Sequence, residues 1–253
     1  MKKVFLITLL LGLFIISCKD KADSKKEETE PETVAEPNVE GMIEDDWTVL
    51  FDGSSFKGWH GYLLDSVPSV WKLEDGAMVF YPPIERKPGE SFNIVTDNEY
   101  TNFILSLEWK ISDAGNSGIF WGVNEDPAYT QPYQTGPEIQ VLDNLKHPDA
   151  KNGTSHQAGA LYDMVAPSKD MVKPVGEWNS CIIMVNHVTN EGKVSLNGVE
   201  IVTFPVNGEQ WNAMIDGSKF SDWNGFGKFT TGKIGLQDHG DIVAYRNIKI
   251  KEL

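Results

Sequence analysis

The stretch Gly232-Lys-Ile-Gly-Leu-Gln-Asp-His-Gly-Asp-Ile-Val-Ala-Tyr-Arg-Asn-Ile-Lys-Ile-Lys-Glu-Leu253 carries the pattern that decides the fold of this chain. Apolar and polar residues alternate on both sides of a turn, and a period of two predicts β-strands. We therefore expect a hairpin whose turn carries Gln237, Asp238, His239 and Gly240. Alternation places Gln237 and His239 on one face, which would belong either to a site or to a polar core.

The same pattern recurs through residues 46–253, where strand-like runs are separated by turn dipeptides of the Asp-Gly and Asn-Gly type. Asn197-Gly198 predicts the tightest hairpin, because both central residues of a type I′ turn need positive φ. Residues 210–215 and 217–223 are expected to form a short helix or an irregular loop. Many short strands in about 200 residues predict a single all-β domain of two packed sheets.

Residues 1–45 differ in composition from the rest of the chain. Two lysines and an apolar run over residues 4–16 precede Ser17-Cys18, as in a bacterial lipoprotein signal, and the run is too short to span a bilayer comfortably. We expect residues 1–17 to be the signal peptide and Cys18 to carry the lipid; a plain secretory signal is the alternative. Residues 18–45 hold few large apolar side chains, which predicts a disordered acidic tether. The protein would then be lipid-anchored to a membrane of the bacterial cell envelope, facing the periplasm or the cell surface.

The formal net charge is −15, and about −11 of it falls in residues 46–253. Such a charge argues against nucleic acid and anionic membrane surfaces as partners of the domain, and it fits a neutral ligand. The chain has two cysteines. If Cys18 carries lipid, Cys181 has no partner within the chain, and its apolar neighbours in the sequence indicate an inert core residue.

Polar residues gather on one face of several expected strands. If those strands lie in one sheet, that face presents Glu108, Lys110, Glu138, Gln140, Gln237, His239 and Arg246. Such a face is either the floor of a cleft or a solvated outer surface, and the pattern alone leaves both open. Asn116 lies between two nearby glycines, as expected where the backbone approaches a ligand closely.

The polar segment from residue 147 to residue 162 is long and contains glycine, which is typical of a loop that lines the mouth of a site. It holds His147, Asp149 and His156, which could ligate a metal ion. Their spacing matches no compelling pattern of metal ligands. We therefore interpret these histidines as surface residues.

Several motifs occur in order along residues 47–253: Leu50-Phe-Asp-Gly-Ser-Ser-Phe-Lys-Gly-Trp59, Trp71-Lys-Leu-Glu-Asp-Gly-Ala-Met-Val79, Gly115-Asn-Ser-Gly-Ile-Phe120, Gly136-Pro-Glu-Ile-Gln-Val-Leu-Asp143, Gly159-Ala-Leu-Tyr162, Lys173-Pro-Val-Gly-Glu-Trp-Asn179, Leu196-Asn-Gly198, Gly235-Leu-Gln-Asp-His-Gly240 and Tyr245-Arg-Asn-Ile248. Together they resemble the 3-keto-disaccharide hydrolase domain family, which includes bacterial lipoproteins. The resemblance implies a jelly-roll sandwich like that of concanavalin A, and activity on 3-keto-glycosides. Family members place an arginine soon after the segment that here reads Phe120-Trp-Gly, so the resemblance does not supply that ligand contact.

The implied activity has a simple chemical basis. A ketone at C3 of a sugar acidifies the proton at C2, because the resulting carbanion is stabilised as an enolate. A base can remove this proton while an acid helps the oxygen at C1 to leave, and water can then add to the product. We predict that His239 and Glu138 form this acid–base pair. Direct hydrolysis by two carboxylates, Glu108 and Glu138, is the alternative route.

The remaining candidates are substrate contacts and a cation. We predict that a small-molecule carbohydrate is bound by Glu108, Asn116, Gln140, Asp143, Tyr162, Gln237 and Arg246. The enolate oxygen would be held by Arg246, Gln140, Asn116 or a bound cation. A divalent cation on Glu138, Asp143 or His239 would suit either route, although the sequence demands no cofactor. The rival function is a carbohydrate-binding module that releases nothing, because a lectin-like sandwich does not fix function.

Overall fold

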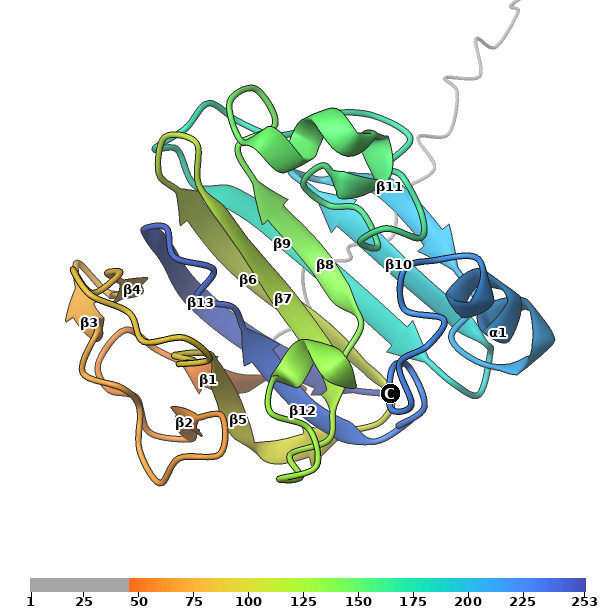
Figure 1. The fold of residues 1–253 in the computed structure, drawn as a ribbon, viewed down its shortest axis with the longest axis horizontal. Coiled ribbons are helices and arrows are strands. Elements are labelled where there is room, and N and C mark those ends of the chain that lie inside the picture. Colours follow the sequence, from red (N-terminus) through yellow and green to blue (C-terminus); the bar gives the residue numbers. More distant parts are fainter. Residues whose placement is uncertain (1–45) are drawn as a thin grey trace, which may run out of the picture. The chain divides into compact units, whose positions relative to one another are not determined.

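The computed structural model describes residues 46–253. The predicted signal peptide, the lipid-bearing Cys18 and the tether lie outside the described residues. Two antiparallel sheets pack face to face (Figure 1), which confirms the predicted two-sheet sandwich. No helix in the described part of the chain is long and apolar enough to cross a membrane.

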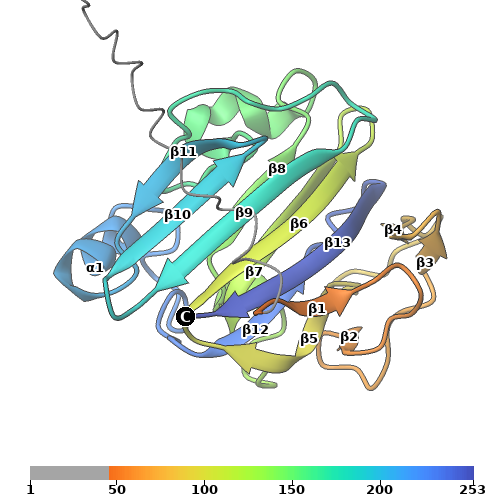
Figure 2. The same ribbon diagram turned by 180° about the vertical axis from the view of Figure 1, so that it is seen from behind.

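The larger sheet fills the foreground of Figure 2 and has eight strands. Seven of them lie in the order β11 (Val199–Phe204), β10 (Glu191–Leu196), β9 (Asn179–Asn186), β6 (Phe103–Ile111), β13 (Val243–Glu252), β4 (Ala77–Phe80) and β3 (Trp71–Glu74), and β1 (Thr48–Phe51) also pairs with β13. The β10–β11 hairpin turns at Asn197 and Gly198, which both have positive φ as the sequence predicts.

The smaller sheet has five strands in the order β2 (Trp59–Gly61), β5 (Ile94–Tyr100), β12 (Gly232–Leu236), β7 (Asn116–Val123) and β8 (Glu138–Leu142). Four helices complete the described chain: α1 (Gly208–Asp216) and the short 3-10 helices η2 (Pro132–Gln134), η3 (Pro148–Asn152) and η4 (Thr154–His156). α1 coincides with one of the two segments in which a short helix was expected.

Alternation on the strands of the larger sheet divides core from solvent. On β6, Leu105, Leu107 and Trp109 are buried while the residues between them are partly exposed. β7 and β8 differ, because every one of their residues is buried. Burial on both faces of a strand means that something covers the outer face of the sheet, and here that cover is made of loops. Polar residues on this covered face lie in a very different environment from those on the outside of the larger sheet.

The predicted C-terminal hairpin is wrong, because β12 and β13 lie in different sheets. The backbone N–H of Gln237 still donates to Gly118 O at 2.9 Å in the smaller sheet. Gly240, with φ of +109°, then lets the chain turn away toward the larger sheet. Six residues separate the two strands, which gives the chain enough length to cross. Gln237 and His239 are therefore held beside β7, while Arg246 is carried to the opposite layer.

Candidate active site

A pocket of about 460 Å³ opens on the face of the smaller sheet that is turned away from the core. It gathers six of the residues that the sequence singles out: Asn116, Glu138, Gln140, Tyr162, Gln237 and His239. They come from β7, β8, the segment after η4, and the crossing between β12 and β13. The pocket therefore brings together residues that lie more than a hundred positions apart in the chain.

Glu138 is a nearly buried carboxyl group that lines this pocket; only 8% of the residue is exposed. It faces Gly118 on β7, where an added Cβ atom would lie 2.1 Å from Glu138 Oε1, so the glycine makes room for the acid. Burial raises the pKa of Glu138 to about 8; the positive charge of Lys219 opposes the rise and Asp149 adds to it. At neutral pH this carboxyl group is mostly protonated and can donate a proton.

His239 lies at the rim of the same pocket, with its Nε2 atom 3.3 Å from Asn116 Nδ2. The residue is exposed to solvent, yet the protein packed around its ring displaces part of the water. This burial lowers the pKa of His239; the charge of Asp241 opposes the effect and that of His147 adds to it. The imidazole is thus neutral at pH 7 and can accept a proton. The acid and the base have their pKa values shifted in opposite directions, which is the arrangement that acid–base catalysis needs.

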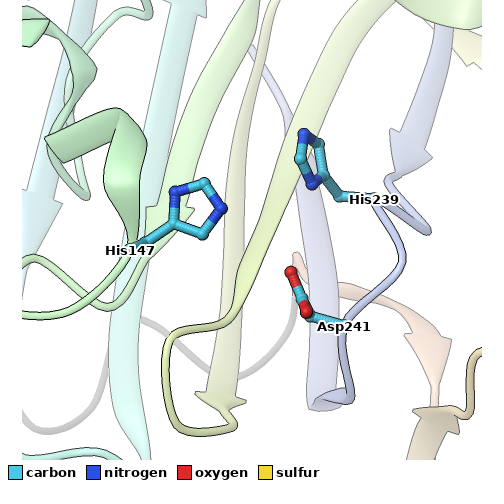
Figure 3. Close-up of side chains that lie close together, drawn as sticks. All are labelled: His147, His239 and Asp241. Carbon is cyan, nitrogen blue, oxygen red and sulfur yellow. The ribbon is translucent and has the colours of Figure 1, made fainter.

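His147, His239 and Asp241 form a cluster that could hold a metal ion (Figure 3). Their side chains point toward one another from two loops, and one ligand atom from each lies within 4.8 Å of the others. Two imidazoles and a carboxylate suit zinc and other first-row divalent cations. Next to His239, the buried Oδ1 atom of Asn116 has no hydrogen-bond partner among residues 46–253. The donor set therefore fits a divalent cation at the rim of the pocket.

This cluster differs from the predicted metal ligands, because it contains His239 but neither Glu138 nor Asp143. Asp143 accepts hydrogen bonds from the backbone N–H groups of Ala114, Leu145 and Lys146. A carboxylate with that many backbone donors is holding a turn, and Asp143 does not line the pocket. Asp143 therefore stabilises the backbone of this region and is neither a substrate contact nor a metal ligand in this pocket.

Glu108 and Arg246 lie on the outer face of the larger sheet, where they form an ion pair. The Arg246 guanidinium also lies 4.0 Å from the centre of the Trp178 ring. The prediction that these two residues share a face with Glu138 is wrong, and with it their role as substrate contacts in this pocket. Alternation fixes which residues share one face of a strand, but it does not say which sheet the strand joins.

Several pocket residues were missed by sequence reasoning. Arg86 comes from the loop before β5 and pairs with Asp238 at 2.7 Å, while the backbone N–H of Phe92 donates to the same carboxylate at 2.7 Å. Lys219 and Trp223 come from the irregular segment after α1. A signal existed only for Asp238, which lies in the Gln-Asp-His-Gly motif. The others lie in segments without periodicity.

Comparison with known proteins identifies the family of this chain. The model of a family described as the 3-keto-alpha-glucoside-1,2-lyase-like domain matches residues 46–251. This chain belongs to that family. A relative from Bacteroides thetaiotaomicron named 3-keto-disaccharide hydrolase is 36% identical over 293 aligned positions, which cover the whole of both chains.

Solved structures support the assignment to the 3-keto-alpha-glucoside-1,2-lyase-like family. A crystal structure from Parabacteroides distasonis, provisionally named a glycosyl hydrolase, is 34% identical with a TM-score of 0.74, covering 82% of this chain and 94% of that one. A second structure from the same organism, with the same kind of name, is 28% identical with a TM-score of 0.61 and covers 83% of this chain and 100% of that one. The resemblance stated from the sequence motifs is thus confirmed.

Proposed function

We propose that this protein is an enzyme that cleaves the glycosidic bond of 3-keto-glycosides. One observation carries the proposal: Glu138, a protonated acid, and His239, a neutral base, line one pocket. Membership of the family and the names of the relatives supply the class of substrate. The net negative charge of the domain agrees with a neutral sugar as the substrate.

The reaction uses the two proton-transfer groups in sequence. His239 removes the acidified proton at C2, and the electron pair moves toward the C3 carbonyl to form an enolate. When the enolate collapses, the bond from C1 to the glycosidic oxygen breaks, and Glu138 donates its proton to that oxygen. The sugar leaves as an unsaturated ketone. Addition of water across its double bond would convert this elimination into net hydrolysis.

The walls of the pocket suit a sugar. Tyr162, Phe220 and Trp223 provide aromatic surface, and the apolar face of a pyranose packs well on such rings. Gln140 and Gln237 provide amide groups. The Oε1 atom of Gln237 is buried without a partner among residues 46–253. A buried acceptor of this kind favours a ligand that brings a hydroxyl group to it.

The cluster of His147, His239 and Asp241 suggests a second role for His239, as a cation ligand. A bound divalent cation would supply Lewis-acid stabilisation of an oxygen anion. In that case His147 and Asp241 would hold the cation with His239, and His239 could not also be the base, because a neutral imidazole has one lone-pair nitrogen and its other nitrogen carries the proton. Calorimetric titration with Zn²⁺ and Mn²⁺ tests this role. We expect the D241N variant to bind the cation at least tenfold more weakly than the wild type.

The lipid anchor is a separate proposal that rests on residues 1–18 of the sequence. If Cys18 is lipidated, the protein expressed in a bacterium should incorporate radiolabelled palmitate and remain in the membrane fraction. The C18A variant should lose both properties. Incorporation of label by C18A would contradict the assignment.

The decisive assay uses a 3-keto-glucoside and the matching unoxidised glucoside, with mass detection of the products. We expect release of the aglycone only from the keto compound. A sugar product that is lighter by one water than the free 3-keto sugar identifies elimination, and a product of full mass identifies hydrolysis. A protein that binds both compounds and releases nothing would be a carbohydrate-binding module, and the enzyme proposal would fall.

A further inference from the structure

Lys219 is a cation without a counter-ion in the wall of the pocket. In the described part of the chain it forms no ion pair with any carboxylate. Its Nζ atom lies 3.9 Å from the centre of the Tyr162 ring and 5.2 Å from that of Phe220. Both rings line the pocket together with Glu138. Lys219 is exposed, and its ammonium group rests on two aromatic faces in the wall of the pocket.

Two arginines, one in the pocket and one predicted as a substrate contact, are already neutralised. Arg86 also lines the pocket, but its guanidinium pairs with Asp238. Arg246, one of the groups that the sequence offered for the enolate oxygen, pairs with Glu108 on the other sheet. In such a contact some N–H groups of the ammonium face the ring, and those directed away from it stay free to donate. Lys219 therefore keeps at least one donor for a ligand.

A closed ring of contacts, centred on His156, holds Lys219 in this position. The hydroxyl of Tyr162 donates to Asp149 Oδ2 at 2.9 Å. His156 lies between Asp149 and Asp163, with its Nδ1 atom 3.0 Å from the first carboxylate and its Nε2 atom 2.9 Å from the second. The backbone N–H of Lys219 donates to the other oxygen of Asp163 at 2.9 Å. The ring closes where the Lys219 ammonium lies over Tyr162.

The ring connects residues 149–163 with the segment that carries Lys219. Within the described part of the chain, these two segments otherwise meet through side-chain packing such as that of Tyr162 on Phe220. Each ring nitrogen of His156 lies within hydrogen-bond distance of one carboxylate, so the imidazole bridges Asp149 and Asp163. Asp163 then fixes the backbone of Lys219, and Asp149 fixes the ring under its side chain. The segment that carries Tyr162 is itself attached to β8, because the Tyr162 N–H donates to Glu138 O at 3.0 Å. The position of the ammonium is thus set relative to the acid.

We propose that Lys219 binds the negatively charged C3 oxygen of the enolate, and that His156 is the positioning residue that keeps its ammonium there. This inference rests on the proposed function and assigns the group that stabilises its intermediate. When the C2 proton leaves, the electron pair moves through C2 and C3 onto the carbonyl oxygen, and Lys219 donates a hydrogen bond to that oxygen. As the C1–O bond breaks, the C3 carbonyl forms again and its oxygen loses the negative charge. Lys219 contributes a hydrogen bond throughout and takes part in no covalent change.

The first test is the K219M variant, with K228M as the matched control. Lys228 is exposed in the same loop and does not line the pocket. We expect K219M to lose about 100-fold or more in kcat on the 3-keto-glucoside, as for removal of one donor to a developing oxyanion. Its affinity for the unoxidised glucoside should change less than threefold. K228M should keep the wild-type rate, and both variants should melt within a few degrees of the wild type.

The pH profile reports whether the Lys219 charge lies close enough to act on the acid. The charge of Lys219 holds down the pKa of Glu138, so the alkaline limb of the pH dependence of kcat should move to higher pH in K219M.

The positioning role of His156 is tested through a double mutant. H156A should lower kcat in the wild type but change it less than twofold in the K219M background, because its effect passes through Lys219. Y162F, which keeps the ring and loses the bond to Asp149, gives the same comparison with a smaller risk of misfolding.

The outcomes separate this inference from the function on which it rests. An active wild type whose rate survives K219M within threefold contradicts the role of Lys219 alone. A rate that survives K219M but disappears with a chelator assigns the enolate to a cation instead. If the wild type releases nothing from the keto compound, the proposed function fails and this inference fails with it.

Discussion

The outer faces of the two sheets carry similar polar residues and differ in what covers them. On the larger sheet, Glu108 and Arg246 pair with each other and face solvent. On the smaller sheet, Glu138 and Gln140 lie beneath loops and are buried. An acid among water and a counter-ion is a surface residue, whereas an acid without water becomes a proton donor with a raised pKa. The loops over the smaller sheet, rather than the alternation on its strands, therefore create the environment of the site.

Replacing the acid on each face should give the largest contrast. We expect E138Q to lose 10²- to 10⁴-fold in kcat on a 3-keto-glucoside, the usual range for a general acid. E108Q, its matched control on the larger sheet, should stay within twofold of the wild type. Steady-state kinetics of both variants measure this. Equal losses in the two would mean that the covered face is not special.

The second-largest effect on activity should come from narrowing the space around the Glu138 carboxyl group. An alanine at Gly118 places a methyl group 2.1 Å from the unmoved Glu138 Oε1, so the carboxyl group must shift. We expect G118A to lower kcat at least tenfold and to lower the free energy of unfolding by about 1–3 kcal/mol, as is usual for overpacking. Activity and urea unfolding measure the two effects. A fully active G118A would show that the exact position of the carboxyl group is unimportant.

The raised pKa of Glu138 predicts a dependence of stability on pH. Its pKa is about 8 in the folded protein against 4.5 for the free group, so the folded state binds more protons between these values. The stability that the neutral acid supports is complete below pH 4.5 and falls as the pH rises toward 8. Relative to the wild type, E138Q should gain about 1.4 kcal/mol of unfolding free energy per pH unit over this window. Parallel curves for the two proteins would contradict the raised pKa.

The smallest effect should come from the surface cluster of the larger sheet. Arg246 lies against Trp178 and pairs with Glu108, all near solvent. An exposed pair of this kind contributes about 0–1 kcal/mol. R246M should therefore change the free energy of unfolding by less than about 1 kcal/mol and leave kcat within twofold. A large loss of activity would bring Arg246 back as a substrate contact.

The fold was predictable because its signals are local. Alternation on β6 and the Asn197-Gly198 turn act over a few residues, and both appear in the structure as expected. The exchange between sheets at Gly240 was not predictable, because a turn between two strands reads alike whether they pair or separate. That one crossing explains why Arg246 was assigned to the wrong layer.

The site was predictable where its residues lie on strands or in motifs. Glu138, Gln140 and His239 belong to this group, and they line the pocket. Lys219 and Arg86 come from loops without periodicity, so their positions depend on long-range contacts such as those to Asp163 and Asp238. Asp143 shows the opposite error, because a carboxylate in a motif can serve the backbone of its own turn.

The protonation of Glu138 is the most direct test of the account. Protein labelled with ¹³C at the glutamate side-chain carboxyl carbon, compared with the labelled E138Q variant to assign the signal, can be titrated by NMR from pH 4 to pH 10. The account predicts that the Glu138 signal titrates near pH 8, well above the 4.5 of a free glutamate. A midpoint near 4.5 would show an ordinary ionised carboxylate at neutral pH, and the assignment of Glu138 as the acid would be contradicted.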